Sequence, residues 1–153
     1  MYHYEECGLS NIWLRDGYSI EEDEEYGELV SIHSVNDLHN AIGLYLIMNK
    51  PELNGDEIRF LRKEMNLSQK NLAGLLGVGE TSIRTWESER GRIGSPTDRL
   101  LRAFYKEHVQ GDGELKSLIE RLNHQERTFV PTDISFVYGA NHSWHPSNGE
   151  TRQ

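Results

Sequence analysis

The chain has 153 residues, of which 25 are acidic and 16 are lysine or arginine, so its formal net charge is −9. That length is enough for one ordinary domain with a small companion. The single cysteine, Cys7, excludes an internal disulfide, and the longest apolar stretch, residues 41–48, is far shorter than the roughly 18 residues that cross a bilayer. We therefore expect a cytoplasmic protein rather than a secreted or a membrane protein.

The negative charge is concentrated in the first third of the chain. Residues 1–54 hold 11 acids and 2 bases, whereas residues 55–110 hold 8 acids and 10 bases. Residues 111–153 hold 6 acids and 4 bases. Because the middle segment is mildly basic, it is the part of the chain that suits an anionic partner.

The first third has the pattern of short strands followed by one helix. Asp16-Gly17 lies between two runs of strand-forming residues and predicts a tight hairpin, and residues 27–33 would add a third strand to an antiparallel meander. Residues 21–28 are predicted to form a solvated acidic loop or edge. A helix over 35–49, capped by Ser34, would bury residues at helical spacing: Leu38, Ala41, Ile42, Tyr45 and Leu46.

Five helices are expected between residues 54 and 125. Asn54 and Glu57 form a capping-box start for the first, and Ser68 caps the second, which stops at Gly77. The third would run over 80–90, and Ser95-Pro96 would open the fourth over 96–108. The fifth would cover 113–124, with apolar residues on one face: Leu115, Leu118, Ile119 and Leu122.

The expected fold class is α+β. A mainly α, five-helix domain over 54–125 would follow a small acidic meander-and-helix domain over 1–53, which would serve dimerisation, sensing or partner binding. Residues 126–153 would form a C-terminal extension, in which the runs 128–130 and 134–138 fit short strands and the polar end is mobile.

The predicted helix over 80–90 has two different faces. At about 100° per residue, Ile83 shares the inward sector with Trp86, Glu87 and Arg90. The outward sector holds Thr81, Arg84, Thr85 and Ser88. Short polar side chains let a helix approach the edges of bases closely, and the threonine methyl suits thymine. This helix therefore fits the major groove of DNA.

The segment over 68–87, SQKNLAGLLGVGETSIRTWE, closely resembles the helix-turn-helix of the phage-repressor family (Cro/CI, also called XRE). The matching residues are Gln69, Leu72-Ala73, Gly77-Val78, Ile83 and Trp86-Glu87. The resemblance covers about residues 55–110. The DNA-binding half is also similar to that of the MqsA-type antitoxins, whose four-cysteine zinc domain this chain lacks.

The resemblance implies roles for individual residues. Gln69 would contact the DNA backbone and support base reading, and the base edges would be read from Glu80, Thr81, Ser82 and Thr85. Arg62 would form a structural ion pair with Glu87, which explains an acid in the inward sector of the helix. The chain departs from the family at Gly79, where a capping Ser or Thr is usual, and at Glu80, an acid at the tip of the helix.

The remaining residues of the predicted DNA face surround the same helix. Ser88 lies on the outward side of this helix and belongs to the predicted DNA face. Phosphate contacts are expected from four surrounding cations: Lys70, Arg84, Arg90 and Arg92. The expected function is that of a sequence-specific transcriptional regulator, a repressor that binds an inverted-repeat operator of double-stranded DNA as a homodimer. We expect such a protein to be encoded by a bacterium or a phage.

An antitoxin is the alternative function. The same DNA-binding domain would then autoregulate its operon, while the acidic region masks a protein toxin through Glu21, Glu22, Asp23, Glu24 and Glu25. The sequence contains no glycine-rich phosphate loop, no nucleophile elbow and no H-E-x-x-H, so neither an enzyme nor a cofactor is expected. A metal site is not expected either, because Cys7 and the scattered histidines lack zinc-ligand spacing.

Overall fold

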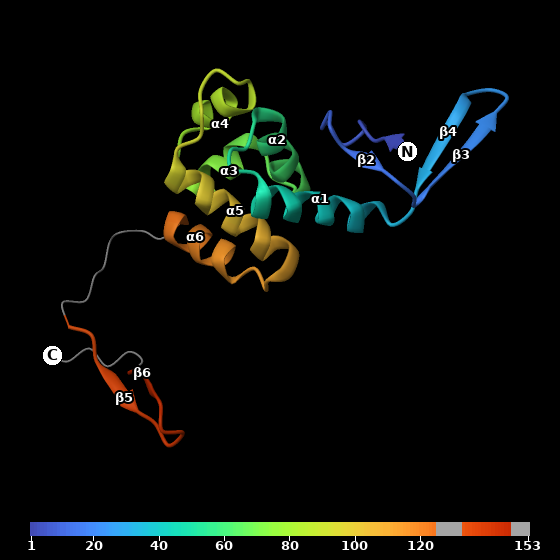
Figure 1. Cartoon of the computed structure of the whole chain (residues 1–153). Coiled ribbons are helices and arrows are strands. Elements are labelled where there is room, and N and C mark those ends of the chain that lie inside the picture. Colours follow the sequence, from blue (N-terminus) through green and yellow to red (C-terminus); the bar gives the residue numbers. More distant parts are fainter. Residues whose placement is uncertain (125–132, 148–153) are drawn as a thin grey trace. The chain divides into compact units, whose positions relative to one another are not determined.

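The computed structural model describes residues 1–124 and 133–147. The chain divides into two compact units, Met1–Asn123 and His124–Gln153. The described residues hold six helices and three antiparallel strand pairs, which confirms the α+β fold class (Figure 1). None of the described helices is long and apolar enough to cross a membrane.

The N-terminal strands pair differently from the predicted meander. β1 (Tyr2–His3) pairs with β2 (Trp13–Leu14), and β3 (Tyr18–Asp23) pairs with β4 (Gly27–Ile32). The prediction of a hairpin at Asp16-Gly17 is wrong, because the chain turns there from one sheet into the next, with the His33 N–H donating to the Gly17 carbonyl at 2.8 Å.

The hairpin turn lies instead between β3 and β4. Asp23 Oδ1 accepts from the N–H groups of Glu25 (2.7 Å) and Tyr26 (3.1 Å), and Gly27 has a φ of +76°. An Asp side chain that accepts two such bonds forms an Asx-type turn, and glycine supplies the left-handed conformation. Of the two alternatives predicted for 21–28, a solvated loop or an edge, part of the segment is therefore paired strand and the rest is the turn.

The helix α1 (Val35–Asn49) has the predicted bounds but a different buried face. Ile42, Gly43, Leu46 and Ile47 are its buried residues, whereas Ala41 and Tyr45 of the predicted stripe are exposed. The close packing of Gly43 against the ring of Tyr105 explains this rotation, since a Cβ at position 43 would overlap the ring.

The five helices expected after residue 54 are all present. They are α2 (Gly55–Glu64), α3 (Gln69–Leu76), α4 (Glu80–Glu87), α5 (Ser95–Gln110) and α6 (Glu114–His124). The predicted capping box of α2 is confirmed, with the Glu57 N–H donating to Asn54 Oδ1 at 2.8 Å and the Asn54 N–H donating to Glu57 Oε1 at 2.9 Å. Two predicted caps are not: Gly94 rather than Ser95 precedes α5, and Ser34 makes no side-chain cap for α1.

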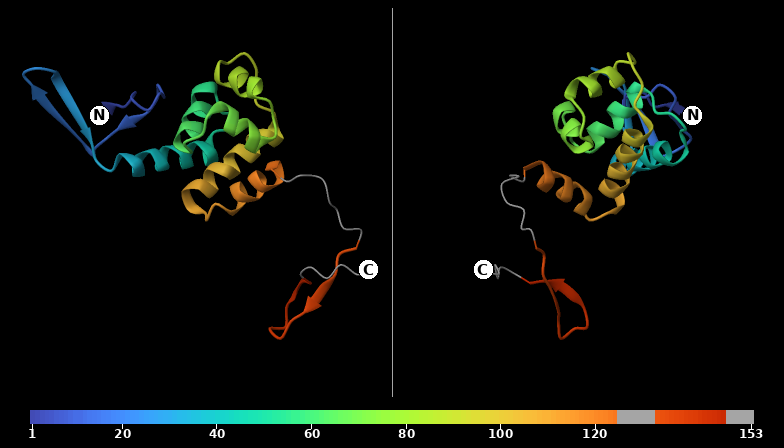
Figure 2. Two further views of the ribbon diagram at one scale, coloured as in Figure 1. Left: turned by 180° about the vertical axis from the view of Figure 1, so that it is seen from behind. Right: turned by 90° about the vertical axis from the view of Figure 1, so that its left-hand side faces the viewer.

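One apolar core joins the helices to the N-terminal segment. Its fully buried side chains come from α2 to α5 and include Ile58, Leu61, Leu72, Ile83, Leu101 and Tyr105. Tyr4, Leu9 and Leu14 belong to the same core. In the two views of Figure 2, α4 and α6 lie at opposite ends of this helical bundle. On α6, Leu118 and Leu122 of the predicted apolar face are exposed.

Burial raises the pKa of Tyr105 to about 12. Because the pKa is higher in the folded chain, the neutral phenol of Tyr105 stabilises the folded state. This contribution is complete below about pH 10 and is lost as the pH rises through 12, since the phenol loses its proton at a lower pH in the unfolded chain than in the folded one. We expect the free energy of unfolding to fall over that window by about 2 kcal/mol more in the parent chain than in Tyr105→Phe. Urea titrations at several pH values measure this, with Tyr26→Phe, at an exposed position, as the control. Equal pH slopes in the parent and in Tyr105→Phe would contradict the assignment.

The second unit contains one short hairpin. β5 (Phe136–Tyr138) lies within the predicted run 134–138, and β6 (Trp144–Pro146), which was not predicted, pairs with it. The other predicted strand, 128–130, and the end predicted to be mobile, 148–153, lie outside the described residues.

Candidate nucleic-acid interface

α3 and α4 form a helix-turn-helix. Ser68 Oγ accepts from the Asn71 N–H at 3.0 Å and begins α3, as predicted. Gly77, with a φ of +71°, ends α3 in the left-handed conformation, and the Val78 N–H donates to the Ala73 carbonyl at 3.0 Å. Gly79 then precedes α4 without a side-chain cap. The two helices pack directly against each other across this turn.

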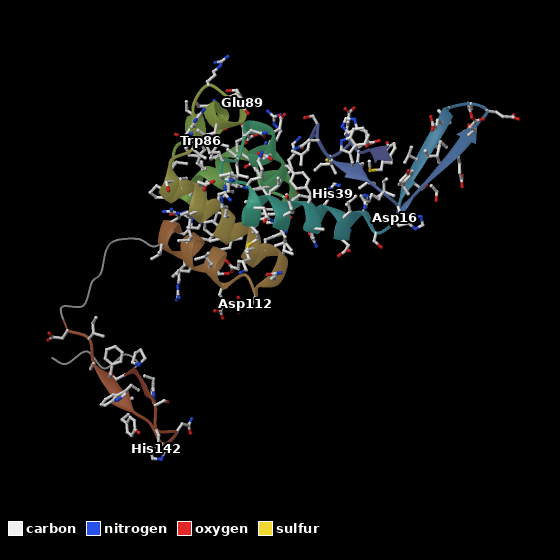
Figure 3. All side chains as sticks on the ribbon, viewed as in Figure 1. Asp16, His39, Trp86, Glu89, Asp112 and His142 are labelled. Atoms are coloured by element: carbon white, nitrogen blue, oxygen red, sulfur yellow. The ribbon has the colours of Figure 1, made fainter. Side chains whose placement is uncertain are left out.

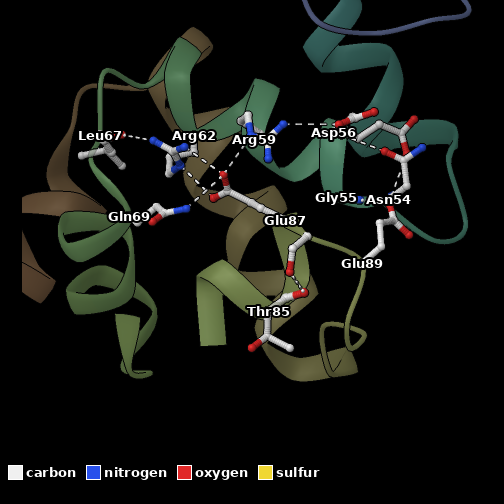
Figure 4. Close-up of polar contacts among 12 residues, drawn as sticks. Asn54, Gly55, Asp56, Arg59, Arg62, Leu67, Gln69, Thr85, Glu87 and Glu89 are labelled. Atoms are coloured by element: carbon white, nitrogen blue, oxygen red, sulfur yellow. Dashed lines mark hydrogen bonds and ion pairs between the residues drawn. The ribbon is translucent and has the colours of Figure 1, made fainter. Parts of the chain in front are cut away.

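A buried carboxylate holds α4 in place. Glu87 is only 3% exposed, and both of its oxygens accept from Arg62, at 2.8 Å from Nε and 2.8 Å from Nη2 (Figure 4). Arg59 Nε approaches the same carboxylate at 3.3 Å. Arg62 Nη1 also donates to the Leu67 carbonyl at 3.0 Å. Because the pair is bidentate and joins α2, the α2–α3 turn and α4, it fixes how α4 sits on the domain.

Gln69 lies at the start of α3 with its amide turned toward this pair. Its Nε2 stands 3.5 Å from Glu87 Oε1, which is at the limit for a hydrogen bond. The resemblance to the phage-repressor family implies that Gln69 contacts the DNA backbone, and that contact stays a prediction.

α4 ends earlier than predicted, at Glu87 rather than at residue 90. Glu89 has a φ of +64°, so the chain leaves the helix there, and its carboxylate accepts from the Gly55 N–H at 2.6 Å. Glu89 therefore contacts Gly55 at the start of α2 (Figure 4), and the backbone of Trp86 also lies against Gly55. Arg90, placed by the helical wheel on the inward sector, is exposed in the following loop.

The outward side of α4 presents short polar groups. Thr81 is exposed, whereas Ser82 and Thr85 are half-buried. Thr85 Oγ1 donates to the Thr81 carbonyl at 2.8 Å, and Ser88 Oγ donates to the Thr85 carbonyl at 3.2 Å. Each hydroxyl oxygen keeps its capacity to accept, and the threonine side chains keep their methyl groups. This surface is suited to hydrogen bonding and methyl contact at base edges.

Two of the predicted phosphate-binding cations are already paired. Arg84 Nη2 lies 2.8 Å from Glu80 Oε1, and Arg92 Nη1 lies 3.3 Å from Glu52 Oε1. Lys70 and Arg90 are exposed and have no ion pair within the described part of the chain. Exposed pairs contribute little to stability, so a phosphate can compete for either arginine. Glu52 was not predicted, because no local pattern links it to Arg92.

The acidic residues predicted to bind a partner lie on the β3–β4 hairpin. Glu22 stands directly opposite Glu28 across the two strands. Among the residues the structure describes, no cation pairs with the hairpin carboxylates. Like charges directly opposite each other destabilise a strand pair, so this hairpin carries uncompensated negative charge.

The histidines of the N-terminal segment make local contacts. The ring of His3 stacks on that of Trp13. His39 (Figure 3) joins Tyr4 Oη, 2.7 Å from Nε2, to Glu64 Oε1, 2.6 Å from Nδ1. These bonds attach the N-terminal segment to α1 and α2 and account for the position of His39 without a ligand.

Two helices joined by a tight glycine turn, the second held by a buried ion pair and presenting short polar side chains, define a helix-turn-helix DNA-binding domain. A family model described as Helix-turn-helix matches residues 58–103. This match supports the predicted resemblance to the phage-repressor (Cro/CI, XRE) type of helix-turn-helix and a role in DNA-binding transcriptional regulation.

The family is one of regulatory DNA-binding domains and not of enzymes. The comparisons with curated proteins and with solved structures found no match. The family match gives no support to the predicted likeness to the MqsA-type antitoxins.

Proposed function

We propose that the protein is a repressor that binds an inverted-repeat operator as a homodimer, with one α4 helix in each of two successive major grooves. The observation that carries this proposal is the outward face of α4, where Thr81 is exposed beside Ser82 and Thr85 while Ile83 and Glu87 anchor the opposite side. The buried face of α4 thus anchors the helix to the domain, and the outward face is free to contact DNA.

Selection of bound sequences from random duplex DNA tests the proposal. We expect enrichment of two inverted half-sites whose centres lie about one helical turn, or 34 Å, apart. Enrichment of a single half-site would contradict the homodimer, and binding without enrichment would contradict sequence reading. Transcription from a promoter that overlaps the selected site should fall when the protein is present; a rise would contradict repression.

Arg90 is the sharpest test of phosphate contact, because it is exposed and carries no intramolecular ion pair in the described ranges. We expect Arg90→Ala to weaken binding to operator and unrelated DNA alike. The slope of log affinity against log salt should become shallower by about one unit per subunit. Fluorescence anisotropy over a salt series measures the slope. Arg121→Ala, on α6, is the matched control; an unchanged slope for Arg90→Ala would contradict the contact.

The uncompensated charge of the β3–β4 hairpin favours a second function, that of an antitoxin whose acidic hairpin covers a basic protein toxin. Electrostatic complementarity of this kind speeds association and selects the partner. Co-expression with the neighbouring gene of the operon tests it. A stoichiometric complex should form and should be lost when Glu21, Glu22, Glu24 and Glu25 are replaced by glutamine. Replacing Glu114 and Glu120 on α6 should leave it intact. A neighbour that is toxic and forms no complex would rule out this function.

A further inference from the structure

Behind the helix-turn-helix lies a cavity of about 270 Å³ that the DNA-binding function does not use. It is open to solvent on one side and is lined by the α2–α3 turn, α3, α5 and the start of α6. Three core residues, Met65, Leu75 and Phe104, form its apolar floor together with the partly buried Leu67. His108 and Lys116 line it from the surface side, where both are exposed. An apolar floor with a few polar groups at its edge is the usual form of a small-molecule site.

Glu107 lines the same cavity and has one unused oxygen. Its Oε1 accepts from the Leu115 N–H at 2.6 Å, at the first turn of α6. Its Oε2 is buried and has no hydrogen-bond partner among the described residues. A buried carboxylate oxygen without a partner is costly, and a donor group that reaches it recovers part of that cost.

We propose that this cavity binds a small amphipathic amine, with its apolar group against the floor and its ammonium group toward Glu107. An ammonium supplies the donors and the positive charge that the free oxygen lacks. The larger cavity of about 460 Å³ beside Trp86 offers no such group. Its three carboxylates all have partners: Glu89 accepts from Gly55, Asp98 pairs with Arg102 at 3.0 Å, and Glu52 pairs with Arg92 at 3.3 Å.

The amine site is connected to α4 through one residue of its floor. Leu67 lines the cavity, and its carbonyl accepts a hydrogen bond from Arg62 Nη1 at 3.0 Å. Arg62 in turn holds Glu87 of α4. A ligand that shifts the α2–α3 turn therefore changes how α4 is positioned on the domain, so the amine acts as an effector of DNA binding. This regulatory half of the proposal rests on the proposed function.

Phenethylamine, which carries an ammonium group on a short chain and a phenyl ring, is a suitable probe. Titrated into the full chain, it should shift the amide resonances of Leu67 and Leu115 saturably. 2-Phenylethanol, which lacks the charge, should bind at least about tenfold more weakly. Glu107→Gln should lower the affinity for phenethylamine by at least the same factor, whereas Glu120→Gln, on the exposed side of α6, should leave this affinity unchanged. Absence of saturable shifts, or equal affinity in Glu107→Gln, overturns the site.

A second variant covers the case in which Glu107→Gln does not fold. His108→Trp adds bulk at the exposed edge of the cavity and should block phenethylamine while the circular dichroism spectrum is retained; unimpaired binding in this variant also overturns the site. For the regulatory half, operator affinity should change about fivefold or more at saturating phenethylamine. An operator affinity that phenethylamine does not change overturns the regulatory half of the proposal and leaves the binding site standing. A chain that binds phenethylamine but no operator refutes the proposed function and leaves the site standing.

Discussion

Replacing Arg62 with methionine should lower the free energy of unfolding by about 3–5 kcal/mol, because it leaves the buried Glu87 carboxylate without its bidentate partner. Arg59 cannot compensate, since it approaches Glu87 through one nitrogen at 3.3 Å and its own side chain is 43% exposed. The Leu67 carbonyl loses its donor at the same time. Urea denaturation at neutral pH measures the change.

The double variant Arg62→Met, Glu87→Met separates the loss of the pair from the loss of packing. Removing both charges should restore most of the stability, because two apolar side chains of similar volume often replace a buried ion pair at little cost. Operator affinity should stay low in the double variant, since the pair that orients α4 is absent. Arg121→Met, at an exposed position on α6, should have no measurable effect. A cost below about 1 kcal/mol for the single variant would show that Glu87 is not held as described.

The parts of the fold that sequence predicted are those decided within a few residues. The Asn54–Glu57 capping box, the Ser68 cap and the left-handed Gly77 are local structures, and each is present where its pattern stands. The inward position of Ile83 follows from helical periodicity in the same way.

The parts that could not be predicted depend on contacts between distant residues. The buried face of α1 is set by Gly43 against Tyr105, far along the chain on α5. Asp16-Gly17 has the residues of a hairpin turn, but the strands select other partners and the turn forms at Asp23 instead. A strand's partner is a tertiary choice that turn chemistry alone does not determine.

In the candidate site, too, the features with a local pattern or a family motif were predicted and the other contacts between distant residues were not. The residues of α4 and the partner of Glu87 were predicted from the motif and the resemblance to the family. The contact of Glu89 with Gly55, the approach of Arg59 to Glu87 and the pairing of Arg92 with Glu52 were not. Each of these joins residues at least 28 positions apart and carries no spacing signal of its own.

Gly55 is the residue at which this distant packing bears most directly on DNA binding. A Cβ at position 55 would overlap the backbone where α4 ends, 2.7 Å from the Trp86 carbonyl oxygen and 2.8 Å from the carbonyl carbon of Glu87. These are backbone atoms, so no side-chain rotation relieves the overlap and α4 must move. The Gly55 N–H would also separate from Glu89.

We expect Gly55→Ala to cost about 1–3 kcal/mol of stability, as overpacking of a close contact does. It should also lower operator affinity at least about tenfold while affinity for unrelated DNA changes little, because base contacts need α4 at one angle and phosphate contacts tolerate a shift. Gly74→Ala is the matched control. Its nearest neighbour would be 3.9 Å away, and within α3 alanine should add up to about 1 kcal/mol. Equal losses on operator and unrelated DNA would mean that Gly55 supports the fold without setting the angle of α4.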